Sequence, residues 1–295
     1  MFATLLGPLP RPPLGDDVAP EALLDAVLEC QALHGLEPLT DAGWGLDRLD
    51  PVLAWRATAA QTDGLVKAVI EGPFTIGRPA TDVRAELLGL AEAGCRWIEV
   101  REPAAAGIGS DVDERARFMD AHMALTAGLG AEVHLSLAIT GGSADGAGID
   151  TLLAGSYASL ALDLIDGPDN WRLATAWPAD RGVICGALSA QEGSDDGPEL
   201  LLWAARYAAS TRGRGPARVG LATAGSLAGL SWSVAAEKVR RLGEAARLGA
   251  ASHDEALAAI DPRAIDKRSA ALGRYEPDAD RPEGRERPAS PAEEH

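Results

Sequence analysis

The strongest constraint on the fold is a repeated alternation of short apolar runs with longer amphipathic segments. The short runs are rich in aliphatic residues and are predicted to be strands, at 2–7, 37–43, 65–72, 96–103, 132–138, 158–165, 182–188 and 217–225. The segments between them are rich in Ala, Leu, Glu and Arg, and the clearest helices are expected at 20–33, 82–93, 112–128, 198–210 and 233–249. This alternation is typical of βα units that build a parallel sheet.

Eight strands with helices between them predict a single (β/α)8 TIM barrel over residues 1–252. A doubly wound open sheet is the alternative, but no predicted strand leads into the GxGxxG turn of a dinucleotide fold. A terminal helical segment is expected at 253–274. The last stretch, 275–295, is rich in Pro, Glu, Asp and Arg and nearly free of aliphatic residues. It is predicted to be a disordered tail, since it has too little apolar surface to bury.

Charge and composition exclude several classes of function. The net charge of −17 disfavours nucleic acid and anionic membranes as partners, because both would be repelled. No apolar run reaches the roughly 18 residues of a membrane span, and the amino terminus lacks the features of a signal peptide. The three cysteines lie far apart without a CxxC pair, so neither a disulfide framework nor a zinc ribbon is indicated. We expect a soluble, cytoplasmic protein that acts on a small molecule.

Polar residues near the predicted strand ends are candidates for a site, because the carboxyl ends of barrel strands face the active-site mouth. Asp163 interrupts the apolar run LALDLI, and a buried carboxylate must be hydrogen-bonded, paired or functional; we favour function. His134, in EVHLSLAIT, is either a packed core residue or part of a site. Arg101 and Glu102 are adjacent, so they face opposite ways unless the strand ends there. A barrel-rim ion pair is the alternative for these two.

Several stretches, taken in order, resemble the C-terminal catalytic barrel of cobalamin-independent methionine synthase. That family contains segments similar to TTIGSFPRT, VTDGEQxRxD, VKGPxTxG, LxxAGxxxIQIDEPA, LGVVDxxSxxxE and PDCGLxxxxxxxAxxKLxxLxxAA. The corresponding segments here are TLLGPLPRP, PLTDAGWGLDRLD, VKAVIEGPFTIG, LAEAGCRWIEVREPA, GVICGALSAQEG and RVGLATAGSLAGLSWSVAAEKVRRLGEAA. The similarity extends in the same order to about residue 250. It implies a barrel of the methionine synthase and uroporphyrinogen decarboxylase type.

The resemblance also implies a zinc ion that lowers the pKa of a thiol substrate, so that the thiolate accepts a methyl group. Carried onto this chain, the ligand positions fall on His134 and Asp163, which are the predicted metal residues. The two cysteine ligands of the family are replaced by Ser136 and Val219. Only two ligands remain, and zinc sites normally have at least three from the protein. The resemblance therefore predicts a degenerate zinc site.

The implied substrate pocket is altered as well. The resemblance assigns substrate binding to Gly7, Asp41, Arg101 and Glu192, and catalysis to Glu102 together with His134 and Asp163. Arg101 stands where the family has the Asp of IDEP, which reverses the local charge and favours a carboxylate or phosphate.

Three hypotheses follow from these patterns. The first is a methyltransferase that transfers a methyl or other alkyl group to a thiol such as homocysteine, with a corrinoid protein as one source of the methyl group. The second is a metal-free barrel enzyme that acts on an anionic small molecule anchored by Arg101. The third is a non-catalytic barrel that binds a ligand or a paralogous partner protein.

Overall fold

The structure is a computed structural model, and it describes residues 1–46, 50–130, 132–194, 197–251 and 256. The chain divides into two compact units, Met1–Ile260 and Asp261–His295, and every described residue belongs to the first. The predicted terminal helix at 253–274 lies outside the described residues apart from Ala256, as does the whole predicted tail at 275–295.

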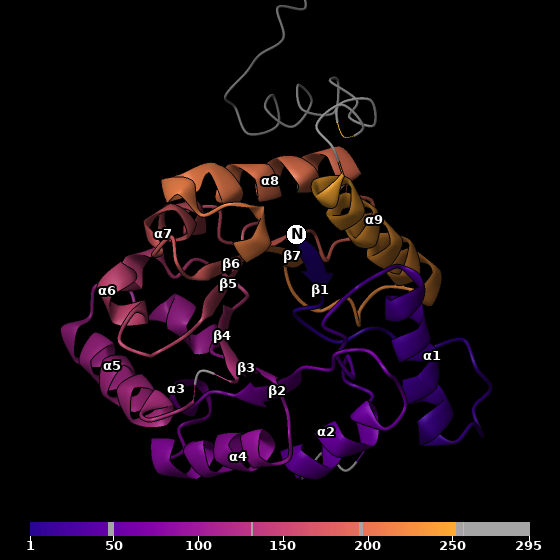
Figure 1. Ribbon diagram of the computed structural model, residues 1–295, viewed down its shortest axis with the longest axis horizontal. Helices are drawn as coiled ribbons and strands as arrows, with labels where there is room; N and C mark the ends of the chain where they lie inside the picture. Colours follow the sequence, from indigo (N-terminus) through magenta and orange to yellow (C-terminus); the bar gives the residue numbers. More distant parts are fainter. Residues whose placement is uncertain (47–49, 131, 195–196, 252–255, 257–295) are drawn as a thin grey trace, which may run out of the picture. The chain divides into compact units, whose positions relative to one another are not determined.

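The first unit is an α/β fold of the TIM-barrel type, built on one parallel sheet (Figure 1). The sheet has seven strands in the order β1-β7-β6-β5-β4-β3-β2, and each neighbouring pair is parallel. The strands are β1 (Phe2–Thr4), β2 (Ala68–Glu71), β3 (Trp97–Arg101), β4 (His134–Ile139), β5 (Ser159–Asp163), β6 (Gly182–Leu188) and β7 (Val219–Thr223).

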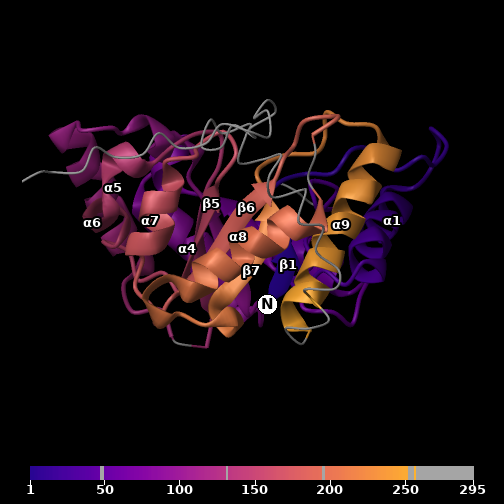
Figure 2. The same cartoon turned by 90° about the horizontal axis from the view of Figure 1, so that it is seen from above.

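Helices surround the sheet in Figure 1 and run alongside the strands in Figure 2. They are α1 (Pro20–Leu33), α2 (Pro51–Ala59), α3 (Pro73–Ile76), α4 (Ala80–Glu92), α5 (Val112–Thr126), α6 (Ile149–Leu152), α7 (Asn170–Ala176), α8 (Pro198–Ser210) and α9 (Trp232–Ala250). Short 3-10 helices are η1 (Pro103–Gly107), η2 (Asp145–Ala147), η3 (Thr211–Gly213) and η4 (Pro216–Arg218). Among the described residues, no helix combines the length and the apolar character that crossing a membrane requires.

The predicted second strand, 37–43, is not a regular strand, which corrects the expectation of eight. Its backbone still reaches both edges of the sheet: Glu37 N donates to Ala3 O (2.8 Å), and Leu39 N donates to Leu65 O (2.8 Å). One isolated parallel bridge joins Leu39 to Val66. Pro38 has no N–H to donate, so a continuous ladder cannot form here. The segment therefore lies between β1 and β2 without adding an eighth strand.

The two faces of the sheet bury different side chains. The face turned toward the helices carries most of the aliphatic core, including Leu5, Ile98 and Leu137. A separate small cluster collects Leu6, Ala138, Ala161, Ile184 and Ala222, with Phe2 and Trp97 packed against it. Side chains at alternate positions of a strand face opposite sides, so this cluster fills the inner face of the curved sheet. Three of its members are alanines, whose small side chains fit the limited space on the inner face of such a sheet.

The five predicted helices are present, as α1, α4, α5, α8 and α9. Helix α2 was not predicted, although its start carries a recognisable signal. The Asp50 carboxylate accepts from Val52 N (2.8 Å) and Leu53 N (3.1 Å), and Pro51 occupies the first helical position. Asp followed by Pro is a typical helix start. This helix matters for function, because it forms one wall of the cavity described next.

Candidate functional site

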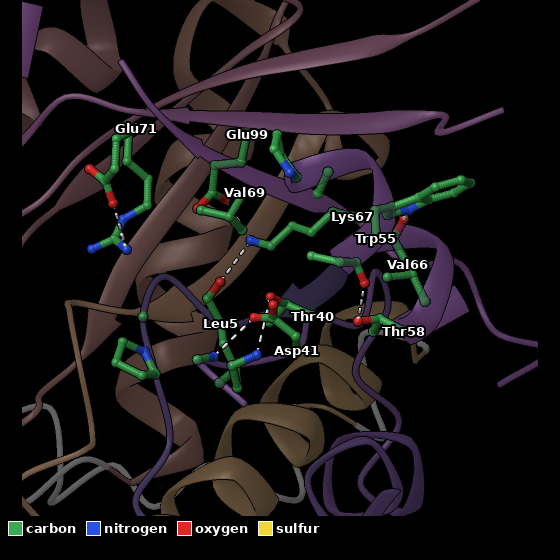
Figure 3. Close-up of a pocket in the computed structure, with 18 residues that line it drawn as sticks. Leu5, Thr40, Asp41, Trp55, Thr58, Val66, Lys67, Val69, Glu71 and Glu99 are labelled. Atoms are coloured by element: carbon green, nitrogen blue, oxygen red, sulfur yellow. Dashed lines mark hydrogen bonds and ion pairs between the residues drawn. The ribbon is translucent and has the colours of Figure 1, made fainter. Parts of the chain in front are cut away.

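A cavity of about 310 Å³ opens beside the carboxyl ends of β1, β2 and β3 (Figure 3). Its walls come from the loop after β1, the irregular segment that lies between β1 and β2, the strands β2 and β3, and helix α2. The polar side chains among its lining residues are Thr40, Asp41, Thr58, Lys67, Glu71, Glu99 and Arg101. In a barrel of this type the carboxyl ends of the strands carry the active site. The cavity is therefore the candidate functional site.

A tight turn after the segment between β1 and β2 builds one wall. Asp41 Oδ1 accepts from Gly43 N (2.9 Å), and Ala42 O accepts from Leu9 N (3.0 Å). Ala42 has φ of 46°, a left-handed conformation that is uncommon for residues other than glycine. Gly43 also has positive φ, and a Cβ added there would lie 2.7 Å from Pro8 Cβ. The turn is held in a strained, defined shape at the cavity.

Gly7 lies on the same wall because another loop crosses it closely. A Cβ on Gly7 would lie 2.7 Å from Ser226 Cα, so a larger residue would push the loop after β7 away. Helix α2 closes the other side, where Trp55 Nε1 donates to Val66 O (3.1 Å). The predicted substrate-binding residues Gly7, Asp41 and Arg101 thus line one cavity.

Lys67 and Glu99 form a buried ion pair in the wall of this cavity, and Figure 3 shows the two side chains pointing toward each other. Lys67 Nζ lies 2.5 Å from Glu99 Oε2 and donates to Leu5 O (2.7 Å). Burial lowers the pKa of the Lys67 amine, and the Glu99 carboxylate opposes that shift. Neither residue was among the predicted site residues.

Arg101 ends β3 on the same face as Glu99, two residues nearer the open end of the cavity. Its Nη1 lies 3.3 Å from Glu71 Oε1, and the Glu71 side chain is 44% exposed. Within the described residues, the buried Nε of Arg101 has no hydrogen-bond partner. The guanidinium is therefore incompletely paired within the described part of the chain, and its carboxylate partner Glu71 can turn toward water.

His134 does not lie at the cavity. It is the first residue of β4, level with Trp97 at the start of β3. Its ring packs on the Trp97 indole with centroids 3.9 Å apart, and its Nε2 lies 2.8 Å from Ser159 Oγ. Burial lowers the pKa of His134 to about 4, so the imidazole is neutral near pH 7. The expectation that His134 lies at the carboxyl end of its strand is corrected, because β4 continues to Ile139.

Asp163 does lie at a strand end, but its carboxylate is occupied by the backbone. Oδ2 accepts from Gly141 N (3.1 Å), and Oδ1 accepts from Ile165 N (2.9 Å) and Asp166 N (3.0 Å). Burial raises the pKa of Asp163, while these three donors act in the opposite direction. The side chain joins the loops that follow β4 and β5.

The predicted metal residues are not brought together. In the β4–β5 register, Leu162 pairs with Ile139, which places Asp163 beside Thr140. Thr140 is six residues beyond His134. At about 3.3 Å per residue, that separates the two by about 20 Å along the sheet, whereas zinc lies about 2 Å from its ligands. Val219, another implied ligand position, begins β7 rather than ending it. This donor set does not fit the implied zinc site.

No other metal centre is evident in the part of the chain that the structure describes. There, no group of three or more His, Cys, Asp and Glu side chains is arranged to hold an ion. Ser136, at the other implied cysteine position, accepts from Trp97 Nε1 (3.2 Å) and is buried. Glu192, a predicted substrate-binding residue, is exposed in the loop after β6 and does not line the cavity.

Glu102 is fully buried and faces away from the cavity. Its oxygens accept from Phe74 N (3.0 Å), Thr75 N (2.7 Å) and Thr75 Oγ1 (2.5 Å), at the start of helix α3. Its Oε1 also lies 3.1 Å from His122 Nε2. The other nitrogen of His122 lies 2.5 Å from the Tyr157 hydroxyl. The predicted catalytic carboxylate therefore anchors α3 and α5 to the end of β3.

The fold and the cavity together define a class: a TIM-type α/β barrel with a charged cavity at the carboxyl ends of its strands. The chain is similar in structure to a B12-independent methionine synthase from Shewanella sp. W3-18-1 in complex with selenomethionine, with TM-score 0.71 and 15% identity. The match covers 87% of this chain and 98% of that one. A putative vitamin-B12 independent methionine synthase from Listeria monocytogenes gives TM-score 0.66 and 14% identity, covering 84% and 97% of the two chains.

These likenesses concern the fold. The chain is also similar to dihydrodipicolinate synthase from Oceanobacillus iheyensis, with TM-score 0.50, 12% identity, and coverage of 92% and 87%. No protein-family model matches the sequence, and no curated protein matches it. One fold supports many reactions, so the chemistry has to be argued from the cavity itself.

Proposed function

We propose that this chain is a barrel enzyme that binds a small carboxylate-bearing molecule in the cavity beside β1, β2 and β3, with Arg101 as the anchor. The observation that carries the proposal is the incompletely paired Arg101 guanidinium in the cavity wall. A planar guanidinium binds a carboxylate through two parallel hydrogen bonds. Glu71 holds Arg101 in the free protein and is exposed enough to give way to a ligand.

Calorimetry tests this function with lactate, pyruvate and 2-oxoglutarate as carboxylate probes. We expect binding that Arg101→Gln weakens about tenfold or more, because a hydrogen bond to a charged group contributes about 1.5–3 kcal/mol. Arg78→Gln is the matched control, since Arg78 pairs with Glu86 on the surface and does not line the cavity. Binding that Arg101→Gln leaves unchanged, or no binding of any probe, rejects the proposal.

A second candidate is methyl transfer to a thiol such as homocysteine. Its support is the sequence resemblance together with the fold likeness to two methionine synthase structures. The positions of His134 and Asp163 weigh against the zinc site that this resemblance implies. Elemental analysis and a thiol methylation assay with a methylated corrinoid or folate donor test it. One zinc per chain together with thiol methylation would support this candidate over the first.

A further inference from the structure

We propose that Lys67 forms an imine with a 2-oxo acid in the cavity and that Glu99 exchanges the proton. This inference rests on the proposed carboxylate site at Arg101 and deepens it by naming the substrate class. It starts from two residues that neither the sequence patterns nor the fold likeness assigned. Both line the cavity, and they contact each other directly.

The Lys67 ammonium group becomes a nucleophilic amine when it loses one proton, and its hydrogen bonds provide an acceptor for that proton. An ammonium group has three N–H donors, and two of them are directed at Leu5 O and Glu99 Oε2. Transfer of one proton across the 2.5 Å contact to Glu99 leaves a neutral amine with a lone pair. The Leu5 carbonyl continues to hold the nitrogen in the cavity wall.

Burial disfavours the charged form of the Lys67 amine. The Lys67 side chain is 0% exposed, and burial lowers the pKa of its amine. Desolvation is the usual way in which proteins make a lysine nucleophilic near neutral pH. Since the side chain is 0% exposed, a carbonyl compound reaches the amine from the cavity only after the Lys67–Glu99 contact opens by side-chain rotation.

The charged groups lie near one another in the wall of the cavity. Glu99 and Arg101 are two residues apart on one face of β3, which is about 6.6 Å along the strand. Arg101 lies close enough to Lys67 for its charge to lower the pKa of that amine. In a 2-oxo acid the carboxylate carbon is bonded to the carbonyl carbon. Such a molecule can place its carboxylate at Arg101 and its carbonyl carbon at the Lys67–Glu99 pair.

The presence of lysine rather than arginine at position 67 also supports imine formation. The chain contains 24 arginines and only three lysines, at positions 67, 238 and 267. A purely structural ion pair is well served by arginine, whose guanidinium stays charged and binds a carboxylate with two hydrogen bonds. Arginine cannot form an imine, so a lysine in the cavity wall supplies a chemistry that the rest of the cavity lacks.

The reaction balances without an additional reagent. The neutral amine of Lys67 attacks the carbonyl carbon, a C–N bond forms, and the carbonyl oxygen takes the proton held by Glu99. The resulting carbinolamine loses its hydroxyl group, which leaves as water after taking a second proton from the amine nitrogen through Glu99. The product is a protonated imine. In total, one ammonium and one carbonyl compound give one iminium and one water, and the net charge is unchanged.

Reductive trapping tests the inference. The full chain is incubated with pyruvate or 2-oxoglutarate and cyanoborohydride, digested, and mapped by mass spectrometry. We expect one reduced adduct per chain on the peptide that contains Lys67. Lys67→Arg keeps the positive charge beside Glu99 and should abolish the adduct, and Arg101→Gln should slow its formation about tenfold or more.

Controls separate this inference from the function on which it rests. Lys238 is also buried but does not line the cavity, so Lys238→Arg should leave adduct formation unchanged. Circular dichroism confirms that each variant is folded. Arg101-dependent binding of both lactate and pyruvate without an adduct on Lys67 overturns the imine and leaves the proposed function intact. Failure of every probe to bind and to form an adduct overturns both, and labelling at only the other amines overturns the imine.

Discussion

Two sectors of the same sheet neutralise their charged side chains in different ways. At the ends of β4 and β5, the Asp163 carboxylate is bonded to three backbone N–H groups. Nearby, Asn170 donates to Asp163 O (2.7 Å) and Gly142 O (3.0 Å), and accepts from Ala144 N (2.8 Å). At the ends of β2 and β3, by contrast, Lys67 is paired with Glu99, and Arg101 with Glu71.

The difference distinguishes charged side chains that hold the fold together from charged side chains that are able to bind a ligand. A carboxylate bonded to backbone N–H groups cannot change partners unless the loops move, so Asp163 is part of the fold. A charge paired with another side chain changes partner by a rotation about side-chain bonds. The sector beside β2 and β3 keeps that freedom and contains the cavity, whereas the sector beside β4 and β5 has lost it.

The largest expected effect comes from breaking the ion pair in the cavity sector. Lys67→Met leaves Glu99 buried without its partner and should lower the free energy of unfolding by about 3–5 kcal/mol. Lys67→Met combined with Glu99→Gln should recover most of that loss, because no buried charge remains. Urea denaturation measures both variants. A loss below about 1 kcal/mol in the single variant would show that the pair is not desolvated, and the contrast between the sectors would fail.

Asp163→Ala should have the next largest effect. It removes the acceptor of three buried N–H groups, and we expect a loss of about 3 kcal/mol in the free energy of unfolding. Asp163→Asn is the matched variant and should cost less, since its amide oxygen still accepts from Ile165 and Asp166. If Asp163→Ala unfolds at the same urea concentration as the wild type, Asp163 is not a structural carboxylate.

The third prediction concerns His134 and the pH dependence of stability. The pKa of His134 is lowered to about 4 in the folded chain, against about 6.5 when unfolded, so the unfolded state binds more protons between these values. The contribution of the neutral His134 to the free energy of unfolding is full above pH 6.5 and is lost as the pH falls toward 4. Over that range, the free energy of unfolding of His134→Gln should fall by about 2 kcal/mol less than that of the wild type, after allowance for partial exposure. Denaturation curves at several pH values check this, and parallel curves for the two proteins would contradict it.

Much of the fold could be predicted from the sequence, because strand and helix periodicity are local signals. The five clearest helices and seven of the eight expected strands are present. The exception, 37–43, has strand-like composition but contains Pro38 and a turn with positive φ at Ala42. That turn is specified by its contacts with the loop after β1, which are not visible in a local pattern.

The positions of the candidate site residues were harder to predict than the fold. Gly7, Asp41 and Arg101 line one cavity, and Glu192 does not line it. His134 was placed at the wrong end of its strand, since an apolar run does not show where the strand stops. Lys67 lies within the predicted strand 65–72 and the segment VKAVIEGPFTIG, and it was given no role. A buried lysine and a carboxylate on a neighbouring strand are themselves a signal, but their contact depends on strand register.

The irregular segment between β1 and β2 has a consequence for how this protein can diverge. If a regular strand stood there, its hydrogen-bond ladder would fix the shape of the cavity wall. A substitution that adapts the cavity to another ligand would then disturb the sheet. Here the wall is a turn joined to the sheet by a few main-chain contacts. Residues 40–45 can therefore be exchanged or lengthened to reshape the binding space while the seven-strand framework stays intact, which makes this stretch the natural place to engineer a new specificity.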